Sequence, residues 1–141
     1  MTQTITHTLV QSLRDVTDFS ELGDDTLLVI VGASVNLLWA ADEMIFEPGS
    51  PAEGLFVVLS GRIQIEDSDG AAIAEIGPGD YFGEHALLLL TSRTKAARAV
   101  EDAELMVIPQ EALQPLLSSN PELAQHFRRK LESRLAENRE S

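Results

Sequence analysis

Residues 62–80, RIQIEDSDGAAIAEIGPGD, decide the fold class. Residues 62–66 alternate polar with apolar side chains, as a half-buried strand does. Asp69-Gly70 then supplies the positive backbone angles of a tight hairpin turn. Residues 72–76 return as the partner strand, and the glycines and proline of residues 77–80 mark the next turn. This stretch therefore predicts an antiparallel hairpin within a β-rich region.

Further short strands are predicted on both sides of the hairpin. Residues 55–59 are a compact apolar run, preceded by the turn cluster of residues 47–51, which cannot continue a helix. Ala99-Val100 and residues 105–108 are the predicted closing strands. Strands at such regular, short intervals favour a small antiparallel β-barrel or jelly roll.

The two ends of the chain are predicted to be helical. Apolar residues recur at helical spacing from Leu9 to Val16, and a second segment begins near Asp24. We therefore expect a single domain over residues 1–141, with helices in 1–35, the barrel in 36–108 and helices in 109–141.

The C-terminal helices have distinct start signals. A first helix covers residues 111–117, and Asn120, Pro121 and Glu122 mark a cleaner second start. The second helix carries an apolar stripe on an otherwise charged surface, and that stripe must be covered by the barrel, a partner or both. Its members lie four residues apart: Leu123, Phe127, Leu131 and Leu135.

The composition indicates a soluble globular protein. The chain has 141 residues, is 44% hydrophobic and contains no cysteine, so neither disulfides nor thiolate metal sites hold it together. The longest uncharged stretch, residues 26–41, is too short and too mixed to span a bilayer, and the first eight residues lack the pattern of a signal peptide. We expect a cytoplasmic location with no membrane span.

The charge is distributed unevenly. The net charge is -13, and the first 90 residues carry just two cations, Arg14 and Arg62. Residues 91–98, in contrast, contain three cations and no acid. An acidic protein with one local positive site is poorly suited to a long polyanion but suits one buried phosphate. Nucleic acid is therefore not an expected partner.

Residues 82–99 combine the groups that such a phosphate would need. Gly83 and the residues after it offer unpaired backbone N–H groups to an anion, and Arg93, ten residues on, can close on the same anion. Glu84 adds a carboxylate beside them. The arrangement predicts a pocket for a small phosphate ester.

The chain resembles the cyclic nucleotide-binding domain family over roughly residues 19–135. The resemblance implies a double-stranded β-helix with N-terminal helices and a C-terminal helix, and residues 82–99 correspond to the family's phosphate-binding cassette. Two signatures occur in order, the first in residues 46–49 and 55–62, and the second in residues 77–84 and 86–88 together with Arg93, Arg98 and Ala99.

The resemblance implies a role for each matching residue. Arg93 stands where the family's arginine pairs with the cyclic phosphate, and a guanidinium fork suits two phosphate oxygens. Glu84 stands where a glutamate accepts the ribose 2'-hydroxyl, helped by the Gly83 backbone. The amide of Ala86 would donate to the phosphate, and the hydroxyl of Thr94 would lie beside the phosphate or the base.

Two positions depart from the family's pattern. Position 85 is usually apolar and is His85 here, so this side chain either lines the pocket or points into the barrel. Lys95 replaces a small residue, and it either adds to the positive field at the phosphate or faces solvent.

Catalytic interpretations have less support. Ser92 and Lys95 match a Ser-x-x-Lys pattern, but the helix start and companion motifs of such acyl-transferring enzymes are absent. The three histidines are widely spread, which disfavours the metal site of a cupin-like enzyme.

We therefore expect a non-enzymatic regulatory module that binds cAMP or cGMP and needs no other cofactor. Movement of its C-terminal helix would signal to an unknown protein effector, and the same helix could form a homodimer. No helix-turn-helix, kinase or pore segment follows that helix, so the module would act in trans or be part of something larger. The alternatives are a nucleotide-independent interaction scaffold and, behind it, a cupin-like metal enzyme.

Overall fold

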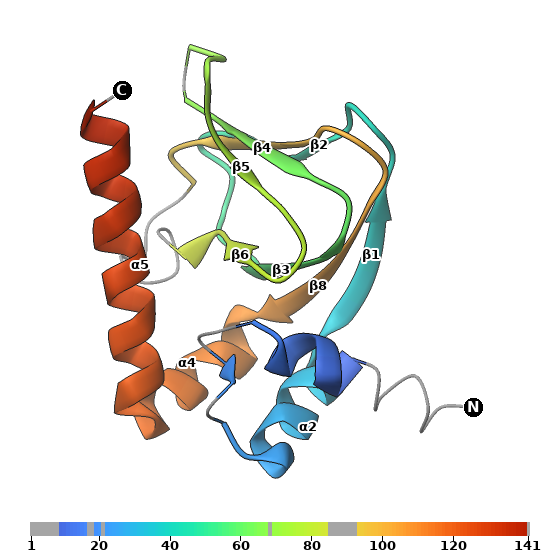
Figure 1. The fold of residues 1–141 in the computed structure, drawn as a ribbon, viewed down its shortest axis with the longest axis vertical. Helices are drawn as coiled ribbons and strands as arrows, with labels where there is room; N and C mark the ends of the chain where they lie inside the picture. Colours follow the sequence, from blue (N-terminus) through green and yellow to red (C-terminus); the bar gives the residue numbers. More distant parts are fainter. Residues whose placement is uncertain (1–8, 17–18, 21, 68, 85–92, 141) are drawn as a thin grey trace.

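The computed structural model describes residues 9–16, 19–20, 22–67, 69–84 and 93–140. Within these residues, eight strands form two four-stranded sheets in which every paired strand is antiparallel (Figure 1). The first sheet has the order β1-β8-β3-β6 and the second β2-β7-β4-β5. This jelly-roll arrangement confirms the predicted fold class. The strands are β1 (Val35–Trp39), β2 (Met44–Phe46), β3 (Gly54–Ser60), β4 (Ile63–Glu66), β5 (Ala72–Ile76), β6 (Tyr81–Phe82), β7 (Ala96–Ala99) and β8 (Ala103–Pro109).

The helices flank the sheets. Residues 9–14 are helical, and they gather with α2 (Asp24–Ala33) and α4 (Gln110–Ser119) at one end of the sheets. The long helix α5 (Pro121–Glu140) runs alongside the sheets instead (Figure 1). Within the described part of the chain, no helix is both long and apolar enough to cross a bilayer.

The hairpin predicted from residues 62–76 is present as β4 and β5. Its turn is held by the carboxylate of Asp67, which accepts the N–H groups of Asp69 at 2.9 Å and Ala71 at 3.0 Å. Gly70 has φ of 85°, the left-handed conformation that a glycine adopts without steric cost. Short-range hydrogen bonds of Asp67 and the conformation of Gly70 therefore stabilise this turn, which is why it was predictable.

The strand predicted at Ala99-Val100 was misplaced. The strand is Ala96–Ala99, and Val100 lies outside it with its side chain exposed. Alanine has little intrinsic preference for strands, so Ala96 and Ala97 did not signal one. They are extended because β7 lies between β2 and β4, and small side chains fit the buried face there.

One hydrophobic cluster lies between the two sheets. Its aromatic part is a stack of Phe56 and Phe82, with ring centroids 5.1 Å apart and planes 9° apart. Phe46 packs against both rings, at 5.7 and 6.0 Å. This cluster contains side chains from β3 and β8 of the first sheet and from β4, β5 and β7 of the second, so it holds the sheets together.

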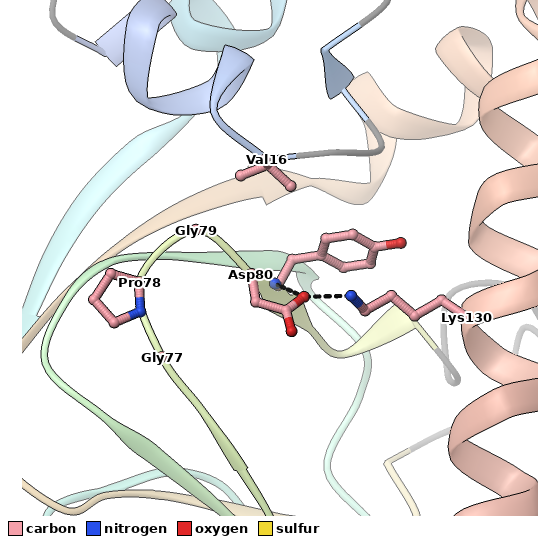
Figure 2. Close-up of a pocket in the computed structure, with 7 residues that line it drawn as sticks. Val16, Gly77, Pro78, Gly79, Asp80 and Lys130 are labelled. Atoms are coloured by element: carbon pink, nitrogen blue, oxygen red, sulfur yellow. Dashed lines mark hydrogen bonds and ion pairs between the residues drawn. The ribbon is translucent and has the colours of Figure 1, made fainter.

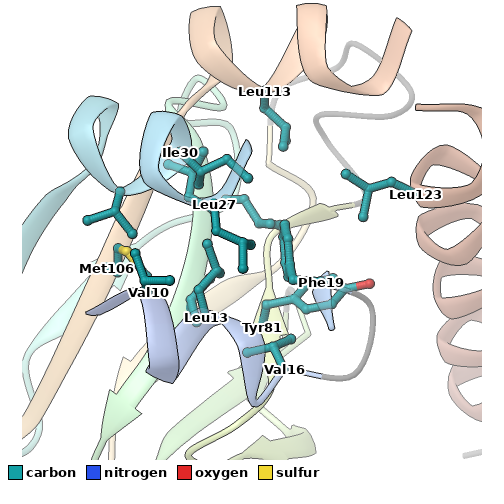
Figure 3. Close-up of a cluster of buried hydrophobic side chains, with 14 of the residues drawn as sticks. Val10, Leu13, Val16, Phe19, Leu27, Ile30, Tyr81, Met106, Leu113 and Leu123 are labelled. Carbon is teal, nitrogen blue, oxygen red and sulfur yellow. The ribbon is translucent and has the colours of Figure 1, made fainter. Parts of the chain in front are cut away.

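A second hydrophobic cluster joins the helices to the first sheet (Figure 3). Phe19, Tyr81 and Phe127 come from three distant segments, and their ring centroids lie 5.0 to 6.0 Å apart. Leu123 and Phe127 of the predicted stripe are buried here, so these two residues face the body of the protein. The side chains of Leu131 and Leu135 lie outside the described residues. Burial of Phe127 against Tyr81 therefore fixes α5 beside β6.

Gly61 connects β3 to β4 at a point where a side chain has no room. Its φ is +88°, and a Cβ there would lie 2.5 Å from the carbonyl oxygen of Asp102 and 2.7 Å from the Cα of Ala103. Both neighbours are backbone atoms, which cannot move away as a flexible side chain would. Gly70 has a similar φ of +85°, but a Cβ added there would meet no atom within 4 Å beyond its chain neighbours.

We expect Gly61→Ala to lower the free energy of unfolding by more than about 2 kcal/mol, because it adds a backbone clash to the cost of a left-handed alanine. Gly70→Ala carries the conformational cost alone and should lose about 1 kcal/mol. Urea unfolding of both variants measures the difference. Equal losses would contradict the close approach at Gly61.

Candidate functional site

The backbone of Arg93 is fixed to the turn between β2 and β3. Its N–H donates to the carbonyl of Ser50 at 2.8 Å, and its own carbonyl accepts the N–H of Gly49 at 2.7 Å. Gly49 has φ of 89°, so the turn residues predicted from residues 47–51 form a bend that receives Arg93. Two backbone hydrogen bonds thus fix the position from which the Arg93 side chain extends.

The Arg93 guanidinium is buried, with 4% of the residue exposed. One terminal nitrogen donates to the carbonyl of Gly83 at 2.7 Å, and the other donates to the carbonyl of Gly54 at 2.8 Å. The guanidinium carbon lies 4.4 Å from the ring centroid of Phe46 and 5.6 Å from that of Phe56, within cation–π range. Its Nε has no hydrogen-bond partner among the described residues.

Burial makes this charge costly. Desolvation lowers the pKa of Arg93 to about 10, although the nearby carboxylates of Glu53 and Glu84 act to raise it. The guanidinium therefore remains cationic at neutral pH, stabilised mainly by carbonyl dipoles and aromatic faces. A buried cation whose Nε has no acceptor among the described residues is suited to receive an anion.

Gly83 allows the arginine to approach the backbone. Its φ is +92°, and a Cβ at this position would lie 2.9 Å from a terminal nitrogen of Arg93 and 3.4 Å from a ring carbon of Phe56. A side chain here would displace the guanidinium. The glycine that the sequence predicted as a turn residue therefore also leaves room for the Arg93 guanidinium.

Glu84 is buried and paired with the C-terminal helix. Just 3% of the residue is exposed, and its Oε1 accepts a charge-assisted hydrogen bond from Arg134 at 2.6 Å. The other terminal nitrogen of Arg134 donates to the carbonyl of Tyr81 at 2.8 Å and lies 3.5 Å from Asp80. An arginine of α5 thus reaches the carboxylate that the sequence predicted as a sugar contact.

A polar pocket of about 330 Å³ lies beside this contact (Figure 2). Its lining comes from Val16, residues 77–81 and Lys130. Figure 2 shows the Lys130 ammonium directed at the Asp80 carboxylate, with which it forms an ion pair. Neither Arg93 nor Glu84 lines this pocket, so it is not the predicted phosphate site.

The structure brings three of the predicted residues together. Arg93 donates a hydrogen bond to the carbonyl of Gly83, and the Glu84 carboxylate is close enough to interact with the Arg93 charge. Thr94 is exposed. His85 and Ala86 lie outside the described residues.

The positive cluster predicted for residues 91–98 is divided. Arg98 is paired with the carboxylate of Glu66 at 3.1 Å and donates to the carbonyl of Asp42 at 2.9 Å. Lys95 is half-buried. Arg93 is therefore the member of the cluster that the fold places beside Gly83.

Sequence reasoning missed several groups around the site. Gly54 and Phe46 contact Arg93, while Asp80, Lys130 and Arg134 connect the site to α5. The i,i+4 spacing of Lys130 and Arg134 indicates that they share one face of the helix. Their partners could not be predicted, because Asp80 and Glu84 lie some fifty residues earlier in the sequence. Among the described residues, no group of three or more histidines and acids is placed to hold a metal ion.

Comparison with known proteins identifies the family. Residues 37–120 match the model of the cyclic nucleotide-binding domain. The chain belongs to the cyclic nucleotide-binding domain family. Gly83, Glu84 and Arg93 all lie within the matched residues.

Two similar proteins are longer than this chain. The chain is 30% identical over 119 residues to Glutaminase 2 of Bradyrhizobium diazoefficiens, which covers 83% of this chain and 19% of the relative. It is 32% identical over 111 residues to a cyclic nucleotide-gated potassium channel of Mesorhizobium japonicum, covering 79% of this chain and 30% of the channel. The chain thus spans less than a third of the length of these relatives.

Solved structures share the fold. The sensor domain of the transcriptional regulator DNR from Pseudomonas aeruginosa superposes with a TM-score of 0.81 at 21% identity, covering 97% of this chain and 95% of that one. The regulatory domain of Toxoplasma gondii PKA with cAMP superposes with a TM-score of 0.82 at 16% identity, covering 92% of this chain and 51% of that one. At these identities the likeness concerns the fold.

We expect Glu84→Gln to lower the free energy of unfolding by about 1 to 2 kcal/mol, because the neutral isostere leaves Arg134 without its buried counter-charge. Glu75→Gln is the matched control, since Glu75 pairs with Arg62 at an exposed site and should lose less than about 1 kcal/mol. Urea unfolding measures both. A loss at Glu84 no larger than that at Glu75 would contradict the importance of the buried pair.

Proposed function

We propose that this domain is a non-enzymatic regulatory module that binds cAMP or cGMP in the cassette around Gly83, Glu84 and Arg93. The observation that carries the proposal is the buried Arg93 guanidinium, whose Nε has no hydrogen-bond partner in the part of the chain that the structure describes. A cyclic phosphate carries one negative charge and accepting oxygens, so it would supply both the counter-charge and the missing acceptor. Membership of the family supports the same ligand class.

Each proposed contact has its own chemistry. Arg93 would bind the phosphate, with the amide of Ala86 as a second donor, and Glu84 would accept a hydroxyl of the ribose beside the Gly83 backbone. A carboxylate is an acceptor, so it selects a donor such as a sugar hydroxyl. His85 and Thr94 complete the proposed set, as pocket-lining and hydroxyl contacts.

The proposed signal is a shift in the population of α5 positions. Lys130 and Arg134 attach α5 to Asp80 and Glu84 at either end of β6. Glu84 would therefore contact both the ligand and α5. The ligand would bind one position of α5 more tightly than another, and it would increase the population of that position. An unidentified protein effector, or a second copy of the chain through α5, would detect that change. We place the module in the cytoplasm, where such a ligand would be available.

A nucleotide-independent interaction scaffold is the second candidate. Both terminal nitrogens of Arg93 already have carbonyl acceptors in the protein, so the arginine also serves as a structural crosslink between Gly54 and Gly83. A scaffold would retain this crosslink and bind no nucleotide.

Calorimetric titration with cAMP and with cGMP distinguishes the two functions. We expect binding of at least one nucleotide, and Arg93→Ala should weaken it by about tenfold or more, since a charge-assisted hydrogen bond contributes about 1.5 to 3 kcal/mol. Arg93→Lys keeps the charge without the fork and should bind with intermediate affinity.

Arg62→Ala is the matched control, because it removes an equal charge from an exposed arginine paired with Glu75. It should bind as the unaltered chain does, and circular dichroism would verify that each variant is folded. No heat with either nucleotide at millimolar concentration would refute nucleotide binding and leave the scaffold. Undiminished affinity in folded Arg93→Ala would refute the assignment of Arg93.

A further inference from the structure

Two charge pairs with matched spacing connect α5 to the cassette. Lys130 and Arg134 lie one helical turn apart on α5, and Asp80 and Glu84 bracket β6 at the same separation in sequence. Lys130 pairs with Asp80, and Arg134 pairs with Glu84 at 2.6 Å and approaches Asp80 at 3.5 Å. Both cations also lie over the Tyr81 ring, with Nζ of Lys130 4.7 Å and Cζ of Arg134 5.8 Å from its centroid.

The two pairs differ in burial. The side chain of Asp80 is 38% exposed, whereas that of Glu84 is 4% exposed. Water can solvate Asp80 if Lys130 leaves, so that pair contributes little. If Arg134 left, the buried Glu84 carboxylate would lose its ion-pair partner and a charge-assisted hydrogen bond, which is strongly unfavourable. The position of the Glu84 carboxylate therefore depends on Arg134 more than the position of Asp80 depends on Lys130.

The geometry of Arg134 restricts how Glu84 can point. One guanidinium nitrogen holds Oε1 of Glu84, while the other is fixed by the Tyr81 carbonyl at 2.8 Å. A guanidinium is planar, so two fixed nitrogens set the direction from which it meets the carboxylate. A carboxylate has further lone pairs for a second donor. Arg134 can therefore orient Glu84 and still leave it able to accept a hydroxyl.

We propose that Arg134 is a positioning residue for sugar recognition: from α5 it holds the Glu84 carboxylate oriented toward the ribose 2'-hydroxyl. The inference rests on the proposed nucleotide function and adds the residue through which α5 enters it. A neutral hydroxyl cannot replace the charge of Arg134, so the arginine and the sugar bind Glu84 together rather than in competition. By linkage, sugar binding then strengthens the docking of α5 by the same factor as docking strengthens sugar binding.

The test compares each cyclic nucleotide with its 2'-deoxy analogue by calorimetry on the full chain. In the unaltered chain, loss of the 2'-hydroxyl should reduce affinity about tenfold or more, because a hydrogen bond to a charged acceptor is lost. In Arg134→Gln, the ratio of the affinity for the nucleotide to that for its 2'-deoxy analogue should fall below about threefold, since Glu84 is no longer oriented. Arg134→Lys restores the charge without the fork and should give an intermediate ratio.

Lys130→Gln is the matched control. It removes a cation from the same face of α5, one turn away, but from the pair with the more exposed Asp80. Its discrimination between ribose and 2'-deoxyribose should stay within about threefold of that of the unaltered chain. An Arg134 variant that weakens both ligands equally would show a structural role alone and overturn the inference.

The outcomes separate this inference from the proposed function. If the unaltered chain binds neither nucleotide, the proposed function fails, and the role of Arg134 in sugar recognition fails with it. If the unaltered chain binds and discriminates, and Arg134→Gln keeps the full ratio, the inference alone is overturned and the nucleotide function stands.

Discussion

The buried guanidinium of Arg93 imposes requirements on segments that are distant in the sequence. Its charge lies away from water, and carbonyl groups from the start of β3 and the end of β6 must converge on it to offset the desolvation. Phe46 of β2 packs its aromatic face against the guanidinium, and the turn at Gly49 and Ser50 fixes the backbone of Arg93. The two sheets therefore have to meet in one relative position for this residue to be stable.

The C-terminal helix depends on the same region. Phe127 packs on Tyr81, while Arg134 bonds to the Tyr81 carbonyl and to Glu84. Apolar contact holds the first part of α5, and ion pairs hold its later part against the cassette. Because β6 carries both kinds of contact and also leads into Gly83, a displacement of the cassette alters the surface on which α5 rests. The contacts of α5 and the carbonyl that binds Arg93 therefore lie on one short stretch of chain, from Tyr81 to Glu84.

Local patterns predicted much of the architecture. The β4–β5 hairpin followed from alternation and from an Asp-Gly turn, both of which act within a few residues. The start of α5 at Pro121 followed from helix-start signals of equally short range. The β7 strand was misplaced because its alanines carry no local preference, and pairing with two neighbouring strands determines their conformation.

The candidate site divides in the same way. The sequence by itself determined that Gly83, Glu84 and Arg93 form one group, because these residues lie within a short segment and match a family pattern. Tertiary structure alone decided that Gly54 and Phe46 enclose Arg93, that Arg98 is paired with Glu66, and that Arg134 reaches Glu84. Those contacts join residues up to 50 positions apart, and their distances depend on packing rather than on spacing along the chain.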